Sequence, residues 1–373
     1  MPTPIPRRTF LAAAGAAAGA ATLTATPAHA TPTPFGRYGS PKHRLTPTTR
    51  YVDPRGAGDH TTVQAAVTAA ATTPAATLVL APGTYRETVS VPATATGMTW
   101  LGTTADPRDT VIVYDNAAGT PKPDASGGTY GTTGSATVTL RPDGFTAHHL
   151  TFANDWLRAD HPEFTGTQAV AVKVMGDRSA FHQCRFLGHQ DTLYADTTAL
   201  TAFARQYFHD CYVEGDVDFV FGRGTAVFER CHFHTLDRTD LTSAPYGFVF
   251  APSTAGANPR GFLVTRGRIS STAPDTYYKL ARPWVPSSDP TAHPSLVVRD
   301  SLLGPGIDPA APYTNMSNTY PWQEQRFAEY RNVGPGAATP TPENRPQLTA
   351  SEAESATRTA YLGDWTPTTK ALR

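Results

Sequence analysis

Two aspartates, Asp191 and Asp218, lie in short strand-like runs of apolar and aromatic residues, GHQDTLY at 188–194 and DVDFVFG at 216–222. A surface aspartate usually occupies a turn beside Gly, Asn or Pro. A carboxyl group among β-branched and aromatic neighbours loses hydration instead, so its surroundings can tune its pKa. Two carboxyl groups in different surroundings can supply a nucleophile and a proton donor to one site.

An internal repeat indicates how the two runs are positioned. Segments that begin at Phe181, Phe208 and Phe228 share the pattern F-x-x-C at intervals of 27 and 20 residues, and 145–152 is a looser copy. Short apolar runs broken by Gly, Pro, Asp and Asn fill residues 77–303, and a unit of this length favours stacked strand coils. We therefore predict an all-β fold, a parallel β-helix (solenoid). A β-propeller or β-sandwich is the alternative, which the uneven spacing and the lack of Asn-Gly hairpin turns disfavour.

The three cysteines fall on this repeat. Stacked strands lie about 4.8 Å apart, which would bring Cys211 and Cys231 side by side. Either a disulfide or two buried thiols fits that arrangement, while Cys184 is expected to be a small buried hydrophobe. The odd number leaves at least one thiol unpaired within the chain, and the absence of C-x-x-C gives a zinc or redox site no support.

Both ends of the repeat region carry different patterns. A capping box at 61–64 predicts a short N-terminal capping helix with Val63, Ala66, Val67 and Ala70 on one face. The tail from about residue 334, rich in Pro and Thr, is expected to pack along the solenoid as a helix or an extended strap.

The N-terminus predicts export. Arg7 and Arg8 precede an Ala/Gly-rich apolar run that ends in an A-x-A pattern at 28–30, which indicates a signal peptide of the twin-arginine type over residues 1–30. An uncleaved anchoring helix is the alternative, which the short run disfavours. Residues 31–50 read as a loose lead-in and 51–373 as a single domain. We expect a secreted, extracellular protein without a membrane partner, because no later apolar run reaches the ~20 residues of a membrane span.

Composition excludes several classes of function. The 373 residues are 39% hydrophobic and carry 31 basic and 31 acidic side chains, a balance that argues against a nucleic-acid partner. H-E-x-x-H, a Gly-rich phosphate loop and G-x-S-x-G are all missing from the sequence. We expect a monomer with neither a metal nor an organic cofactor.

Five motifs, in family order over about residues 50–330, resemble those of pectin methylesterases (pectinesterases). They are SAT at 135–137, QAVA at 168–171, the two aspartate runs, and ARPW at 281–284. The resemblance implies a right-handed parallel β-helix. It also implies hydrolysis of the C6 methyl esters of galacturonate units in pectin, which yields methanol and pectate.

The resemblance assigns the catalytic roles. Asp218 would be the nucleophile, Asp191 the general acid and then base, and Gln190 an oxyanion donor. Asp191 must then start protonated and Asp218 ionised. We expect burial and repulsion from Asp218 to raise the pKa of Asp191, and Arg282 to lower that of Asp218. Because neighbouring strand residues point to opposite faces, a bulge or bend is expected at Gln190.

The same resemblance implies a substrate-binding set of amide, hydroxyl, aromatic and cationic side chains: Thr137, Gln168, Tyr194, Phe221, Arg282 and Trp284. Flat aromatic rings bind the apolar faces of sugars with little loss of rotamer freedom. Arg223 and Gly224 depart from the Asn-Ala that plant members often carry, which leaves subsite preference open.

Other interpretations of these residues remain. Asp216 and Asp196 read as turn or surface acids, and the histidines as structural. The alternative functions are a β-helix lyase or glycosidase, which would act on the glycosidic bond, and a non-catalytic solenoid that binds cell walls. An aspartic protease is disfavoured because Asp191 lacks the Gly of that motif.

Overall fold

The computed structural model describes residues 47–123, 127–338, 340–341 and 343–369. These residues belong to one compact unit. The predicted signal peptide and nearly all of the lead-in lie outside them.

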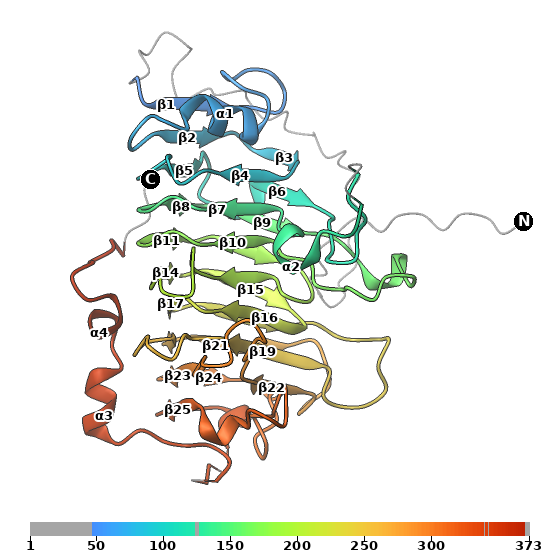
Figure 1. The fold of residues 1–373 in the computed structure, drawn as a ribbon, viewed down its shortest axis with the longest axis vertical. Coiled ribbons are helices and arrows are strands. Elements are labelled where there is room, and N and C mark those ends of the chain that lie inside the picture. Colours follow the sequence, from blue (N-terminus) through green and yellow to red (C-terminus); the bar gives the residue numbers. More distant parts are fainter. Residues whose placement is uncertain (1–46, 124–126, 339, 342, 370–373) are drawn as a thin grey trace, which may run out of the picture. The chain divides into compact units, whose positions relative to one another are not determined.

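Three parallel sheets, as far as the described residues go, form the walls of a parallel β-helix (Figure 1). The first sheet runs in the order β1 (Thr49–Val52), β2 (Thr77–Leu80), β5 (Thr99–Gly102), β8 (Thr146–His148), β11 (Ser179–His182), β14 (Arg205–His209), β17 (Thr225–Glu229), β20 (Phe262–Thr265), β23 (Ser295–Arg299) and β25 (Arg326–Tyr330). The second runs β3 (Gly83–Arg86), β6 (Thr110–Tyr114), β9 (Thr151–Asn154), β12 (Arg185–Leu187), β15 (Tyr212–Gly215), β18 (His232–Thr235), β21 (Arg268–Ser271) and β24 (Leu302–Leu303). The third runs β4 (Val89–Val91), β7 (Val138–Leu140), β10 (Val172–Val174), β13 (Leu193–Ala195), β16 (Val217–Gly222), β19 (Gly247–Pro252) and β22 (Tyr278–Ala281).

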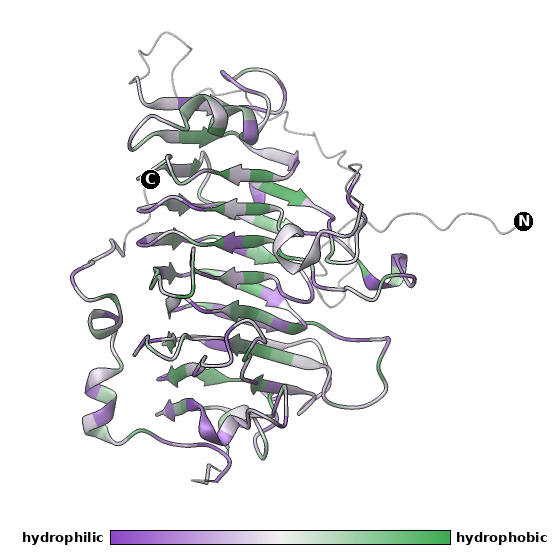
Figure 2. Cartoon of the chain, viewed as in Figure 1, coloured by the Kyte–Doolittle hydropathy of each residue, from purple (hydrophilic) through white to green (hydrophobic). Residues whose placement is uncertain are grey.

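Each coil passes through the third, the first and then the second sheet, as in β13, β14 and β15. Hydrophobic residues concentrate on the strands (Figure 2). The parallel β-helix is confirmed, and the propeller and sandwich are wrong. Short helical elements interrupt or flank the coils: α1 (Val63–Ala70), α2 (Gly131–Gly134), α3 (Ala350–Ser355), α4 (Arg358–Leu362), and the 3-10 turns η1 (Pro107–Asp109), η2 (Arg158–Asp160), η3 (Trp322–Glu324) and η4 (Pro335–Ala337).

The sequence repeat corresponds to stacking in the first sheet. Phe181, Phe208 and Phe228 occupy equivalent positions of β11, β14 and β17. Their rings stack inside the core with centroids 4.9 and 4.7 Å apart. Such pairs contribute about 0.5–1.5 kcal/mol each beyond the area they bury, so the repeat stabilises the register of successive coils.

A left-handed turn residue follows seven strands of the first sheet, and these residues have φ between 49° and 58°: His149, Gln183, Asp210, Arg230, Arg266, Asp300 and Arg331. The turns stack through backbone hydrogen bonds, such as Gln183 N–H to the carbonyl of His209 at 3.0 Å. This ladder compensates a conformation that costs a residue with a side chain about 1–2 kcal/mol.

The cysteines come directly after three of these turns, and all three are buried free thiols. Cys211 and Cys231 lie on adjacent coils, where His232 N–H donates to the carbonyl of Cys211 at 2.8 Å. Of the two arrangements left open by the sequence, the structure has the thiols. Cys184 is a buried core residue as predicted.

The helix before the coils and the tail after them both pack on the β-helix as expected. The four predicted residues of α1 are those that pack into the core. The predicted capping box is wrong: Thr62 is the N-cap, and the carboxylate of Glu87 accepts the N–H groups of Val63 and Gln64. The tail forms a strap, with Tyr361 and Leu362 packed on outward residues of β14, β17, β20 and β23 (Figure 1).

Candidate active site

Asp191 and Asp218 lie on adjacent coils of the third sheet. Asp191 precedes β13 in a turn, and its N–H donates to the carbonyl of Val217 in β16 at 3.0 Å. The two side chains are only 7% and 6% exposed, respectively. The repeat therefore brings together two acids that are 27 residues apart in the sequence.

Both aspartates occupy strained backbone positions, with φ of 66° at Asp191 and 51° at Asp218. The first is the bend expected at Gln190 and Asp191. At the second, the register of β16 on β19 shifts between Val217 and Val220, so that two residues of β16 oppose one of β19. A bulge of this kind turns a side chain out of its regular direction, and strained positions of this kind cluster at functional sites.

Arg282 binds Asp218 through two hydrogen bonds. Its Nε donates to one carboxylate oxygen at 2.8 Å and its Nη2 to the other at 2.6 Å. The guanidinium also covers the ring of Phe248, with 3.8 Å between the guanidinium carbon and the ring centroid. A bidentate pair of this type fixes the orientation of a carboxylate and favours its ionised form.

The two acids differ in their electrostatics. Burial raises the pKa of Asp191 well above its usual range, and the charge on Asp218 raises it further. Burial also raises the pKa of Asp218, but the pair with Arg282 opposes this rise. Arg282 lowers the pKa of Asp218 as expected, although desolvation outweighs the guanidinium and the net shift is upward. The expected difference remains, because the pKa of Asp191 is raised further than that of Asp218.

Backbone hydrogen bonds align the predicted polar residues beside the acids. Thr137 N–H donates to the carbonyl of Val170 at 2.9 Å, and Ala169 N–H to the carbonyl of Gln190 at 3.0 Å. Thr137, Gln168 and Gln190 therefore lie on successive coils that lead to the aspartates. Thr137 Oγ1 is buried and has no hydrogen-bond partner in the part of the chain that the structure describes.

The three predicted aromatic residues form one cluster with different exposures. The rings of Tyr194 and Phe221 stack on each other at 4.1 Å and are 4% and 3% exposed. Trp284 packs against both and is partly exposed. Tyr194 and Phe221 thus form a floor, and Trp284 has the most ring surface open to a ligand.

Sequence reasoning missed a charged cluster beside the acids. Asp216 is fully buried and accepts two hydrogen bonds from Arg158, at 2.6 and 2.8 Å. Nδ1 of His189 lies 3.2 Å from the same carboxylate. Burial opposes ionisation of Asp216, but Arg158 and His189 hold its pKa well below the usual range.

Asp216 lies in the bend between β15 and β16, but neither it nor Asp196 is at the surface, so the interpretation as surface acids is wrong. Asp196 is 2% exposed and pairs with Lys173 at 3.1 Å. The Asp-x-Asp spacing at 216–218 was the one available signal for Asp216, since residues two apart in a strand point to the same face. Nothing in the sequence pointed to Arg158.

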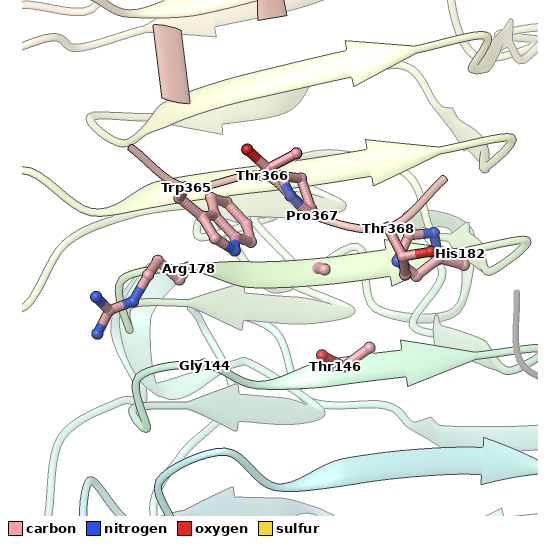
Figure 3. A pocket seen from close by; sticks show the side chains of 9 residues that line it. Gly144, Thr146, Arg178, His182, Trp365, Thr366, Pro367 and Thr368 are labelled. Carbon is pink, nitrogen blue, oxygen red and sulfur yellow. The ribbon is translucent and has the colours of Figure 1, made fainter. Parts of the chain in front are cut away.

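A separate pocket, of about 320 Å³, lies on the first sheet rather than at the aspartates. Trp365 and Thr366 to Thr368 of the strap cross the strands that carry Thr146 and His182 there (Figure 3). It contains none of the predicted site residues. His182 stacks on His148 at 4.8 Å in this region, in line with the structural role predicted for the histidines.

Within the described ranges, no group of three or more His, Cys, Asp or Glu side chains is arranged to hold a metal ion. No helix in that same part of the chain has the length and apolar character needed to span a membrane.

Known proteins resemble this chain in both sequence and fold. The model of the pectinesterase family matches residues 50–363. A pectinesterase of Ralstonia solanacearum is 36% identical over 314 residues, covering 76% of this chain and 78% of that protein. Pectinesterase 31 of Arabidopsis thaliana is 34% identical over 288 residues, covering 76% and 81%.

Solved structures of pectin methylesterases have a fold similar to that of this chain. Pectin methylesterase PemA from Erwinia chrysanthemi superposes with a TM-score of 0.75 at 29% identity, covering 87% of this chain and 99% of that one. A mutant pectin methylesterase in complex with a hexasaccharide gives 0.75 at 30% identity, covering 85% and 98%. With its three-sheet β-helix, its two adjacent aspartates and a family match over residues 50–363, the chain belongs to the pectinesterase family.

Proposed function

We propose that this pectinesterase hydrolyses the methyl esters of galacturonate units in pectin, with Asp218 as nucleophile and Asp191 as general acid and base. One observation carries this assignment. Of two buried carboxyl groups on adjacent coils, Asp218 has a bidentate guanidinium partner, and Asp191 has no hydrogen bond to its side chain within the described residues. The pair thus favours one ionised and one protonated acid.

In the first half-reaction, a carboxylate oxygen of Asp218 attacks the ester carbonyl carbon. The resulting tetrahedral oxyanion needs a donor that does not titrate, and the amide NH₂ of Gln190 supplies one. Asp191 gives its proton to the departing methoxide, which leaves as methanol. The products of this step are an anhydride between Asp218 and the galacturonoyl carbon, and an ionised Asp191.

In the second half-reaction, the carboxylate of Asp191 accepts a proton from water while the water oxygen attacks the galacturonoyl carbon. The anhydride bond breaks and Asp218 leaves as a carboxylate, again paired with Arg282. The sugar keeps one new oxygen and ionises to pectate. Asp191 is protonated again and both acids are restored.

The neighbouring residues would bind the sugar chain. Trp284 offers a partly exposed ring above the floor of Tyr194 and Phe221, and such rings bind the apolar faces of sugars. Gln168 presents an amide from the preceding coil, whereas the hydroxyl of Thr137 is fully buried one coil further away. We propose that the enzyme acts outside the cell, because the N-terminal sequence has the features of an export signal and pectin is a wall polymer.

The test is the stoichiometry of the reaction on highly methylated pectin. The wild-type protein should release one methanol for each carboxylate formed, with no loss of chain length. Unsaturated products would indicate a lyase instead, and shortened chains a glycosidase. Binding to pectin without methanol would indicate a non-catalytic solenoid.

A further inference from the structure

Residues 155–168, the greater part of the loop between β9 and β10, form a packed element beside the aspartates. The rings of Trp156, His161 and Phe164 stack in parallel, with centroids 5.7 and 5.2 Å apart and interplanar angles of 9° and 7°. The carbonyl of Gln168 anchors the end of the loop by accepting the N–H of Ala118 at 2.7 Å. A loop held in this way can position other groups.

Its C-terminal end orients the proposed oxyanion donor. The hydroxyl of Thr167 donates to Oε1 of Gln190 at 2.6 Å. Because the amide oxygen accepts this bond, the NH₂ group points in the other direction. No protein group in the described part of the chain accepts from that NH₂, so its two donors are free for a ligand.

Its N-terminal end binds the turn that carries the acids. Arg158 neutralises Asp216, whose carboxylate also accepts the N–H of Val217 at 2.6 Å. The N–H of Asp216 in turn donates to the carbonyl of His189 at 3.1 Å. Through the carboxylate of Asp216, Arg158 is thus connected to Val217, which precedes Asp218, and to His189, two residues before Asp191.

We propose that residues 155–168 are a positioning element of the active site. In this element, Thr167 orients the amide of Gln190. Arg158 acts through Asp216 and holds the Asp191 turn against the strand of Asp218. This inference rests on the proposed function and deepens it. Arg158 has a second effect at the same point, because it compensates a buried negative charge two residues from the nucleophile. An uncompensated Asp216 would oppose the ionisation of Asp218.

The first test replaces Thr167 with Val, which has nearly the same shape but no hydroxyl. We expect kcat for methanol release to fall about tenfold with KM almost unchanged, because an oxyanion donor acts in the transition state only. Thr167→Ser should restore most of the rate. Thr94→Val, an exposed threonine in the turn after β4 and outside this element, is the matched control and should behave as wild type.

The second test separates positioning from folding. Arg158→Gln should lower kcat at least about tenfold, since it leaves Asp216 buried without its cation. The double variant Arg158→Gln/Asp216→Asn removes both charges and should recover part of that loss. A double variant no faster than Arg158→Gln overturns the role of Arg158, and it does so even if the single variant folds poorly.

The outcomes distinguish this inference from the proposed function. A wild-type protein that releases no methanol from pectin overturns both. An active wild type with an unchanged kcat in Thr167→Val overturns the inference alone. A rise in KM without a fall in kcat would place Thr167 in ground-state binding and would also overturn it.

Discussion

Arg282 offers the sharpest test of the electrostatics. Replacing it with Gln removes the two hydrogen bonds of 2.8 and 2.6 Å and the one cation that directly contacts Asp218 among the described residues. A cation at this range lowers the pKa of a carboxyl group by about 1–3 units, equivalent to about 1.4–4 kcal/mol. Burial already raises the pKa of Asp218, so loss of Arg282 raises it further.

The assay is the pH dependence of kcat/KM for methanol release. The nucleophile works only when ionised, so the rate falls as pH drops below the pKa of Asp218. A higher pKa moves this acidic limb to higher pH, by about 1–3 units in Arg282→Gln. Arg282 also lowers the pKa of Asp191, so the alkaline limb should move in the same direction.

Arg282→Lys is the matched variant, because it keeps the charge but not the bidentate geometry. Its acidic limb should move less than that of Arg282→Gln. Near-ultraviolet circular dichroism would show that both variants are folded, since the guanidinium also packs on Phe248. A folded Arg282→Gln enzyme whose acidic limb coincides with that of wild type would refute this reasoning.

The remaining predictions concern stability and the thiols. Asp191→Asn should be inactive but should melt at a higher temperature than wild type, and this difference should grow as pH rises above about 4. The reason is that the pKa of Asp191 is raised in the folded state, so wild type loses stability as pH rises towards that pKa. An equal difference at all pH values would disprove this. Burial lowers the pKa of His182 to about 4, so wild type should lose stability as pH falls below about 6.5. His182→Phe should weaken this dependence of the melting temperature on pH. An unchanged dependence would show that His182 is not responsible. Three thiols should react with a thiol reagent after denaturation without reductant, and almost none before; one reactive thiol would reveal a disulfide.

The β-helix could be predicted from the sequence because its stacked coils appear there as a repeat. The Phe positions that recur at 181, 208 and 228 stack directly on one another, and each Cys follows the same left-handed turn. The face of α1 could also be predicted, since helical spacing determines which residues are buried. Its cap could not, because Glu87 comes from a later coil.

The site was only partly predictable, because some of its residues depend on partners from distant parts of the sequence. Asp191 and Asp218 are marked by unusual apolar neighbours, and the motifs carry Gln190 and Arg282. Asp216 was misread because its burial depends on Arg158, which lies 58 residues earlier in a loop without a motif. An ion-pair partner that is distant in the sequence leaves no local sequence pattern. The same holds for Lys173, the partner of Asp196.

The most direct test of the central claim is methanol release by Asp218→Asn, which keeps the shape of the side chain and removes the nucleophilic carboxylate. Asp210→Asn is a matched control, because Asp210 lies in a left-handed turn between the first two sheets. We expect that Asp218→Asn folds but releases no methanol above background, while Asp210→Asn keeps near wild-type activity. A folded Asp218→Asn enzyme with substantial methanol release would show that Asp218 is not the nucleophile.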